Sequence, residues 1–258
     1  MKLLITGSNG FVGGSVGRWA ARAGHEVLGV ARASQPAPGW PGAYAQADAL
    51  ASDLTETINA FAPDALLHAA GTASVGASLK APLDDLRASV LTWANVLDSV
   101  RRSRSRPLVL FPSSAAVYGD LPELPARESE DPRPISPYGF HKAACELLAR
   151  EYADCFGLDI LVCRLFSVFG EAQRRLLVWE LYRQFAGPDP VVWLEGTGEE
   201  TRDYLHADDV AAALLELAAG PRGGGRCLVV NVGSGVETGV LELARGVGAL
   251  VAPSKGVR

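Results

Sequence analysis

Short apolar runs alternate along the chain with longer segments in which apolar residues recur at helical spacing. A short apolar run is typical of a buried strand, and helical spacing is typical of a helix with one buried face. The predicted strands are Leu3–Thr6, Glu26–Val30, Ala43–Gln46, Ala65–His68, Leu108–Phe111, Asp159–Cys163 and Cys227–Val230. The predicted helices are Phe11–Ala23, Leu54–Phe61, Pro82–Val100, Tyr138–Phe156, Arg174–Phe185, Ala207–Ala219 and Thr238–Gly248. This alternation predicts an α/β fold with a Rossmann-type, doubly wound parallel sheet.

One long connection, from Gly119 to Pro137, contains five prolines and shows no periodic pattern. A connection of this length without secondary structure is usually functional or mobile. We therefore expect it to be functional or mobile.

Composition narrows the class of protein. The 258 residues are 48% hydrophobic, which is enough for a packed core, and the net charge of −5 disfavours nucleic acid and anionic membranes as partners. The four cysteines form no CxxC pair and have no metal-ligand spacing with the histidines, so we predict buried thiols and no metal site. Met1 leads directly into an apolar strand and no apolar stretch is long enough to cross a membrane, so we expect a cytoplasmic protein.

The first strand is followed at once by Gly7, Gly10 and Gly13 and then by a predicted helix. Glycines at this spacing let the backbone turn tightly, approach a pyrophosphate and pack the helix on the strand. The helix N-terminus offers free N–H groups to the anion. The segment therefore predicts a dinucleotide-binding turn.

The end of the second strand bears on the choice of dinucleotide. An acidic residue there would bind the ribose 2′-hydroxyl of NAD, but the sequence has Ala31 followed by Arg32. A guanidinium can accommodate the 2′-phosphate of NADP. The cofactor is therefore NAD or NADP, and Arg32 favours NADP.

Tyr138 and Lys142 are four residues apart at the start of a predicted helix, so they share one face. An ammonium beside a phenol stabilises the phenolate, and such a tyrosine can act as a general acid or base. Ser114 follows the fifth strand, at the sheet edge where ligands bind in parallel sheets. We predict that Ser114, Tyr138 and Lys142 are catalytic, with Ser114 bonded to the substrate hydroxyl that Tyr138 deprotonates.

Together these motifs resemble the extended short-chain dehydrogenase/reductase family, and in particular its nucleotide-sugar epimerases and dehydratases. The resemblance runs from Met1 to about residue 245 and is carried by Thr6–Gly13, Asp48–Ala49, His68–Gly71, Ser114 with Tyr138 and Lys142, and Thr201–Tyr204. With the turn and Arg32, it implies cofactor contacts at Gly7, Asn9, Gly10, Phe11, Val12, Arg32, Asp48, Ala49, His68, Ala69, Ala70, Gly71, Tyr138 and Lys142. It implies substrate contacts at Ser114, Ser167 and Arg202, with Arg202 on the diphosphate.

Departures from the family pattern narrow the choice among the family's reactions. The family's dehydratases carry an Asp-Glu pair after the catalytic hydroxyl, whereas this chain has Ala115 and Ala116. It therefore lacks an acid to protonate the leaving hydroxyl, and dehydration is not expected. The run Ser114–Gly119 is most similar to that of UDP-glucose 4-epimerases. The resemblance thus implies epimerisation through transient oxidation at the sugar C4. An NADPH-dependent nucleotide-4-ketosugar reductase, which needs the same residues, is the alternative that Arg32 favours.

Other departures concern the substrate side. Ser167 and Ser89 stand where the family usually has asparagine, and the chain has few residues after Gly235, where relatives usually continue. We expect a dinucleotide-binding domain over residues 1–166 and 204–235, and a small, C-terminally shortened substrate-binding lobe over 167–203 and 236–258. A partner subunit that completes this lobe is one explanation for its size.

Two non-enzymatic hypotheses remain open. The chain could be a non-catalytic cofactor sensor, although it retains Ser114, Tyr138 and Lys142. It could instead be a structural subunit that stabilises a catalytic paralogue. The apolar faces of Pro82–Val100 and Tyr138–Phe156 suit a four-helix interface, and we expect a homodimer through these two helices.

Overall fold

The computed structural model describes residues 1–194, 196–220 and 223–257, and it divides into two compact units. The larger unit comprises Met1–Leu165 and Asp208–Val232, and the smaller comprises Phe166–Ala207 and Gly233–Arg258. Within the described ranges, no helix is long and apolar enough to cross a membrane.

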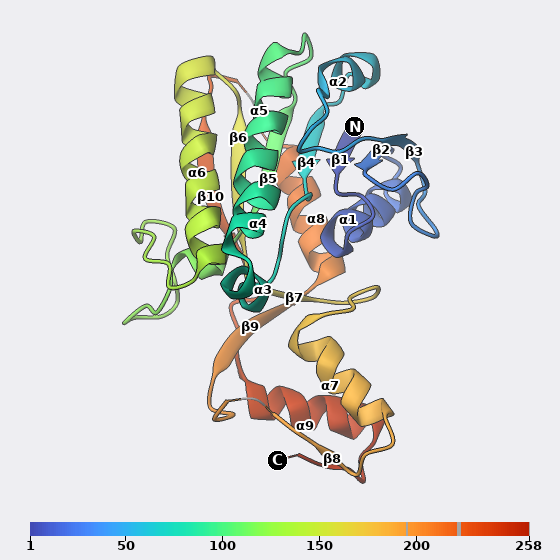
Figure 1. Cartoon of the computed structure of the whole chain (residues 1–258), viewed down its shortest axis with the longest axis vertical. Helices are drawn as coiled ribbons and strands as arrows, with labels where there is room; N and C mark the ends of the chain where they lie inside the picture. The colour runs from blue at the N-terminus through green and yellow to red at the C-terminus, as the bar shows by residue number, and fades with distance from the viewer. Residues whose placement is uncertain (195, 221–222, 258) are drawn as a thin grey trace. The chain divides into compact units, whose positions relative to one another are not determined.

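The larger unit is built on a parallel sheet that has seven strands over the described residues (Figure 1). In spatial order these are β10 (Cys227–Val232), β6 (Ile160–Leu165), β5 (Leu108–Ser114), β4 (Ala65–His68), β1 (Lys2–Thr6), β2 (Glu26–Ala31) and β3 (Ala43–Gln46). The chain runs outward from β1 through β2 to β3 and then returns to β4 on the other side of β1. The order of the strands therefore reverses between β1 and β4, which is where open α/β sheets bind their ligands.

The helical elements of the larger unit are α1 (Phe11–Arg22), α2 (Thr55–Phe61), α3 (Val75–Lys80), α4 (Pro82–Leu86), the π turn η1 (Arg87–Leu91), α5 (Thr92–Arg102), the 3₁₀ turn η2 (Ala115–Val117), α6 (Pro137–Phe156) and α8 (Ala207–Ala218). Figure 1 shows α5 and α6 side by side along the sheet.

Local sequence explains the ends of α6. The hydroxyl of Ser136 accepts a hydrogen bond from the N–H of Gly139, and Pro137 occupies the first turn, where no N–H is needed. Gly157 ends the helix in the left-handed conformation at φ 69°. These signals fix where the helix that carries Tyr138 begins.

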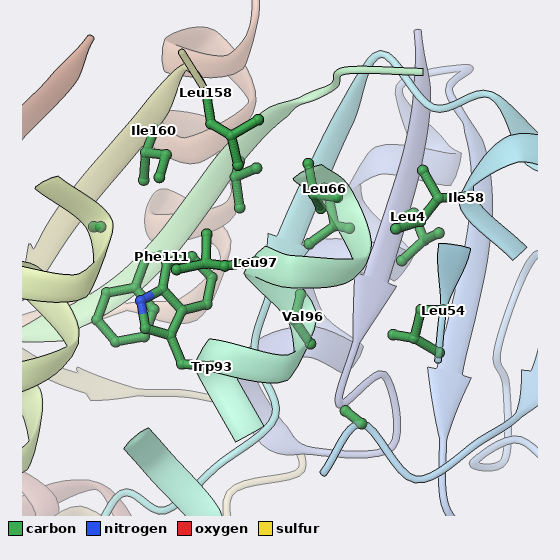
Figure 2. Packing of buried hydrophobic residues seen from close by; sticks show 14 of the residues in the cluster. Leu4, Leu54, Ile58, Leu66, Trp93, Val96, Leu97, Phe111, Leu158 and Ile160 are labelled. Atoms are coloured by element: carbon green, nitrogen blue, oxygen red, sulfur yellow. The ribbon is translucent and has the colours of Figure 1, made fainter. Parts of the chain in front are cut away.

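The core beneath α2, α5 and α6 is drawn in Figure 2. Leu4, Leu66 and Phe111 project from the central strands, and Trp93 of α5 stacks on Phe111 with ring centroids 4.6 Å apart. The indole N–H of Trp93 donates to the carbonyl of Cys145 on α6, at 3.0 Å. This core therefore joins α5 and α6 to each other as well as to the sheet.

Trp40, in the connection between β2 and β3, packs against two glycines. A Cβ on Gly17 of α1 would lie 2.4 Å from the indole, and one on Gly29 of β2 would lie 2.6 Å from it. Only glycine leaves this space at either position. The indole thus fixes the connection against α1 and β2.

The smaller unit contains β7 (Ser167–Phe169), α7 (Leu176–Ala186), β8 (Val191–Val192), β9 (Thr201–His206), β11 (Glu237–Gly239), α9 (Val240–Val251) and β12 (Gly256–Val257). Strand β9 pairs in parallel with β7 and antiparallel with β11, and β8 pairs with β12. Its own core is formed by Leu181, Phe185, Val192 and Ala244.

The structure confirms the predicted fold class and corrects several details. The segment Pro82–Val100 is not one regular helix, because the π turn η1 interrupts it. The predicted helix Thr238–Gly248 begins too early, since Thr238 pairs with Arg202 between strands. The thiols of Cys145 and Cys163 are buried, and burial raises their pKa to about 12, but Cys155 is exposed and not buried as expected.

Candidate active site

The glycine turn lies at the carboxyl end of β1, in contact with the end of β4. Gly7 has φ +74°, and a Cβ there would lie 2.4 Å from the backbone nitrogen of Ala70. A Cβ on Gly13 would lie 2.5 Å from the carbonyl oxygen of Gly7. Both positions require glycine, because any side chain would push the turn away from β4 or from α1.

Helix α1 begins at this turn with its first N–H groups open. Gly10 is the N-cap residue and has no side chain with which to cap them, and the first turn contains no acidic residue. The N–H groups of Phe11, Val12 and Gly13 precede the first intrahelical bond, which Gly14 donates to Gly10. A phosphate fits this arrangement, since it supplies the missing acceptors and complements the helix dipole.

The side chain of Asn9 is used within the protein. Its amide nitrogen donates to the carbonyl of Gln35 at 3.1 Å, and its amide oxygen accepts from the N–H of Ala37 at 2.9 Å. Asn9 therefore holds the connection that follows β2 against the glycine turn.

Arg32 follows β2 directly, and its backbone is braced from β3. Gln46 donates to the carbonyl of Arg32, and the hydroxyl of Tyr44 donates to that of Ala33, at 3.1 and 2.6 Å. The guanidinium is exposed and forms no ion pair with any carboxylate of the described ranges. Its charge is available to an anionic ligand.

Asp48 and Ala49 form the wall beyond the ends of β2 and β3. The carboxylate of Asp48 accepts a hydrogen bond from the N–H of Leu50 at 3.0 Å. Asn95 on α5 donates to the carbonyls of Ala49 and Ser52, at 2.9 and 2.8 Å. The wall is therefore held rigidly by α5.

His68 ends β4 and is buried, with its ring 5.0 Å from that of Trp93. Its Nδ1 lies 2.8 Å from the hydroxyl of Thr6. Burial, and to a lesser extent the charge of Lys142, lowers the pKa of His68 to about 3, so the ring is neutral. His68 thus supports the end of β4, and the three residues after it reach the surface.

A cleft of about 600 Å³ opens at the switch point, a size typical of small-molecule sites. Of the predicted cofactor residues, it brings together Gly7, Asn9, Gly10, Arg32, Asp48, Ala49, Ala69, Ala70 and Gly71. Phe11, Val12, His68, Tyr138 and Lys142 do not line it. Open N–H groups, the guanidinium groups of Arg32 and Arg87 and a largely apolar lining suit a dinucleotide, with the diphosphate at the glycine turn.

Tyr138 and Lys142 lie in the first turns of α6, next to the carboxyl end of β5. Both side chains are nearly buried, and the ammonium of Lys142 lies 5.8 Å from the centroid of the Tyr138 ring. Lys142 also donates to the carbonyl of Pro112 at 2.8 Å. Ser114 ends β5, where its hydroxyl oxygen accepts from the N–H of Ala116 at 3.2 Å. The three predicted catalytic residues thus come from two elements of the larger unit that pack together.

Two buried networks around this triad were missed by the sequence analysis. In the first, Arg164 of β6 pairs with Glu146 of α6, and Ser113 donates to the same carboxylate at 2.5 Å. Glu146 lies one helical turn beyond Lys142, so a polar residue on that inward face was the available signal.

The second network joins α4 to α6 beside Tyr138. Nδ1 of His141 lies 2.5 Å from a carboxylate oxygen of Asp85, and Thr72 donates to the other oxygen. Thr72 also lies 3.0 Å from the hydroxyl of Ser89, the serine that stands in place of the family's asparagine. No motif in the sequence links these residues.

The proline-rich connection is tied to the last strand of the sheet. Tyr118 donates to the side-chain oxygen of Asn231 at 2.7 Å, and the amide nitrogen of Asn231 donates to Ala126 at 2.9 Å. The backbone N–H of Asn231 donates to Glu128 at 2.8 Å and, as the largest cause, lowers the pKa of that carboxyl. One asparagine on β10 therefore binds this connection at two points, Ala126 and Glu128.

The other two predicted substrate residues belong to the smaller unit. Ser167 begins β7 and pairs with Tyr204 of β9. Arg202 of β9 is exposed, and its guanidinium donates to the carbonyl of Thr201 at 3.1 Å. Asp203 accepts from the N–H groups of Ser234 and Gly235, both at 2.8 Å, which holds the turn before β11.

A doubly wound sheet with a glycine turn at its switch point, and a Tyr-x-x-x-Lys pair beside a serine at a strand end, define an enzyme of the short-chain dehydrogenase/reductase type. Comparison with known proteins narrows this class. The model of the NAD-dependent epimerase/dehydratase family matches residues 3–233, and the chain belongs to that family.

Individual relatives are consistent with this family. A UDP-glucose 4-epimerase from Mycolicibacterium smegmatis is 31% identical over 267 residues, which cover 99% of this chain and 84% of the relative. A GDP-6-deoxy-D-mannose reductase from Pseudomonas aeruginosa is 30% identical over 94% of this chain and 77% of its own length. The crystal structure of a UDP-glucose 4-epimerase from Brucella ovis with NAD has a TM-score of 0.87 and 30% identity, and covers 100% of this chain and 85% of that one.

Proposed function

We propose that this chain is a nucleotide-sugar 4-epimerase that oxidises the sugar transiently at C4. The observation that carries the proposal is the set Ser114, Tyr138 and Lys142 on β5 and α6, with only alanine at positions 115 and 116. A reversible oxidation needs one group that takes and returns a proton. It needs no second acid to expel a leaving group.

In this proposal, Tyr138 accepts the proton of the 4-hydroxyl as C4 is oxidised, and returns it when the opposite face of the ketone is reduced. Ser114 donates a hydrogen bond to the same oxygen. The buried ammonium of Lys142 stabilises the phenolate of Tyr138. A nicotinamide dinucleotide in the cleft supplies the hydride acceptor and donor.

For the smaller unit, we propose that Arg202 binds the diphosphate of the nucleotide sugar and that Ser167 contacts the substrate. This guanidinium is exposed and, among the described residues, is bonded to nothing stronger than a carbonyl, which suits it to a phosphate. We propose the smaller unit as the substrate-binding lobe because it carries Arg202 and Ser167.

A second candidate function is an NADPH-dependent nucleotide-4-ketosugar reductase. Arg32 favours it, because a guanidinium after β2 with no carboxylate at Ala31 suits a 2′-phosphate. The relative from Pseudomonas aeruginosa is a GDP-6-deoxy-D-mannose reductase, so a nucleotide-sugar reductase occurs among the relatives. The choice between NAD and NADP is therefore tied to the choice of reaction.

The test is to incubate the purified protein with UDP-, GDP- and dTDP-sugars and with their 4-keto forms, with NAD⁺ or NADPH, and to follow sugar products by NMR and cofactor absorbance. The epimerase predicts a C4 epimer with no net consumption of cofactor. One NADPH oxidised per 4-ketosugar reduced would establish the reductase instead. Binding of dinucleotide without turnover of any sugar would contradict both and favour a sensor.

We further propose a homodimer in which α5 and α6 of each subunit form a four-helix interface. Phe140 and Leu147 of α6 are 59% and 69% exposed, which is unusual for large apolar side chains on one helix. Sedimentation equilibrium tests this. A monomer at micromolar concentration would contradict it, and Leu147→Glu is expected to dissociate the dimer.

A further inference from the structure

Between α4 and α5, the helix contains a single widened turn, η1 (Arg87–Leu91). The N–H and the hydroxyl of Thr92 both donate to the carbonyl of Arg87, five residues earlier, and the hydroxyl bond is 3.1 Å long. Such π turns are rare, and they occur frequently at functional sites.

The extra residue changes which side chains face the cleft. The orientation of α5 is fixed by Trp93, Val96 and Leu97, which are fully buried in the core. One inserted residue rotates the preceding segment by roughly 100° relative to α5. In this rotated position, Asp84, Arg87 and Ala88 line the same cleft as the glycine turn.

A short series of backbone contacts places η1 near the glycine turn. The carbonyl oxygen of Ala88 lies 3.4 Å from the point where a Cβ on Gly71 would stand. The neighbouring Ala70 meets Gly7 in the same way, at 2.4 Å. Arg87 directly precedes Ala88, which lies beside Gly71, and Gly71 follows the alanine that borders the glycine turn.

Within the part of the chain that the structure describes, the guanidinium of Arg87 is only weakly engaged. Its contact with Asp84 is 3.9 Å long, and the two side chains are 57% and 79% exposed. An exposed ion pair at that distance contributes little, so most of the guanidinium's donors remain available. Arg32, the other arginine that lines the cleft, lies after β2, where the adenosine ribose binds in this fold.

We propose that Arg87 is a phosphate-binding residue, whose guanidinium contacts the diphosphate of the dinucleotide from the η1 side of the cleft. The inference rests on the proposed function only in requiring a dinucleotide in the cleft. It assigns the two arginines different tasks: Arg87 serves NAD and NADP alike, and Arg32 distinguishes between them.

The test is the affinity of the full chain for NAD⁺, NADP⁺, ADP-ribose and adenosine, measured by calorimetry or by displacement. Arg87→Gln is expected to weaken the three diphosphate ligands by about tenfold each and to leave adenosine unchanged, because it removes a charge-assisted hydrogen bond to phosphate. Arg87→Lys keeps the charge but lacks the paired N–H donors of a guanidinium, so its loss of affinity should be intermediate. Arg32→Ala should weaken NADP⁺ alone.

Arg22→Gln is the matched control, since it removes the same charge from the exposed last turn of α1, outside the cleft. Thermal unfolding of each variant checks that it folds, and Arg87→Lys gives a second measurement should Arg87→Gln be unstable. Unchanged affinities in both Arg87 variants, or a loss confined to NADP⁺, would overturn the inference. A wild-type protein that binds NAD⁺ but converts no sugar would defeat the proposed function and leave this inference intact.

Discussion

Arg164 donates two hydrogen bonds to the carboxylate of Glu146, from Nε at 3.1 Å and from Nη2 at 2.7 Å, in the interior of the larger unit. The pair joins β6 to the helix that carries Tyr138 and Lys142, and Ser113 adds a third hydrogen bond. The position of the catalytic helix thus depends on a charge pair that is largely shielded from solvent.

Arg164→Met should therefore be strongly destabilising, because it leaves the Glu146 carboxylate buried without a counter-charge. We expect a loss of about 3–5 kcal/mol in the free energy of unfolding, measured by urea denaturation. Arg101→Met, which breaks the more exposed pair with Asp98, should cost less than about 1 kcal/mol. Similar losses in the two variants would contradict the role given to the buried pair.

Tyr138→Phe removes the phenolic proton carrier and little else. Turnover of the nucleotide sugar should fall about a thousandfold, the typical contribution of a general acid–base group, with unchanged affinity for dinucleotide. Single-turnover kinetics and calorimetry measure the two quantities separately. Activity within a few-fold of wild type would disprove the proposed mechanism.

The space beside Trp40 gives a packing prediction. In Gly29→Ala, the new Cβ would meet the indole at 2.6 Å and the hydroxyl of Ser8 at 2.8 Å, so we expect a loss of about 1–3 kcal/mol from overpacking. Adding Trp40→Leu to this variant should recover part of the loss. Gly76→Ala, where nothing lies within 4 Å, is the control and should be neutral or slightly stabilising.

His68 should make the protein less stable in mild acid. Its folded pKa of about 3 lies below the unfolded value of 6.5, so the unfolded chain binds the proton first and stability is lost as pH falls below about 6.5. Between pH 7 and pH 5, this group should account for roughly 2 kcal/mol of lost unfolding free energy. Denaturation of wild type and His68→Gln at both pH values measures the difference, and identical pH dependence would refute it.

The sequence predicted the parts of the fold in which one physical rule dominates. The inner strands β1, β2, β4 and β5 are largely apolar runs buried on both faces, and the glycine turn and the ends of α6 have strong local signals. Strands β7, β9 and β11 were missed because their half-buried residues show no such pattern. The π turn could not be predicted, since periodicity alone does not show where one extra residue is inserted.

The residues of the candidate site also differ in how far the sequence indicates them. The sequence proposes Ser114, Tyr138 and Lys142 because spacing along one helix and position at a strand end both point to them, and the structure places them on β5 and α6. The pairing of Asp85 with His141 depends on how α4 packs against α6, which becomes visible only in three dimensions. The roles of all these residues stay predictions until the variants are measured.

The bonds between Asn231 and the proline-rich connection have a consequence for how the chain folds as it is synthesised. Residues that contact each other across a long stretch of sequence can join only after everything between them has been made. Ala126 and Glu128 must wait for β10, which emerges from the ribosome well after α6. Until then the bonds from Asn231 to Ala126 and Glu128 are absent, so nascent chains halted before Asn231 should be cleaved more readily in this stretch than the complete chain.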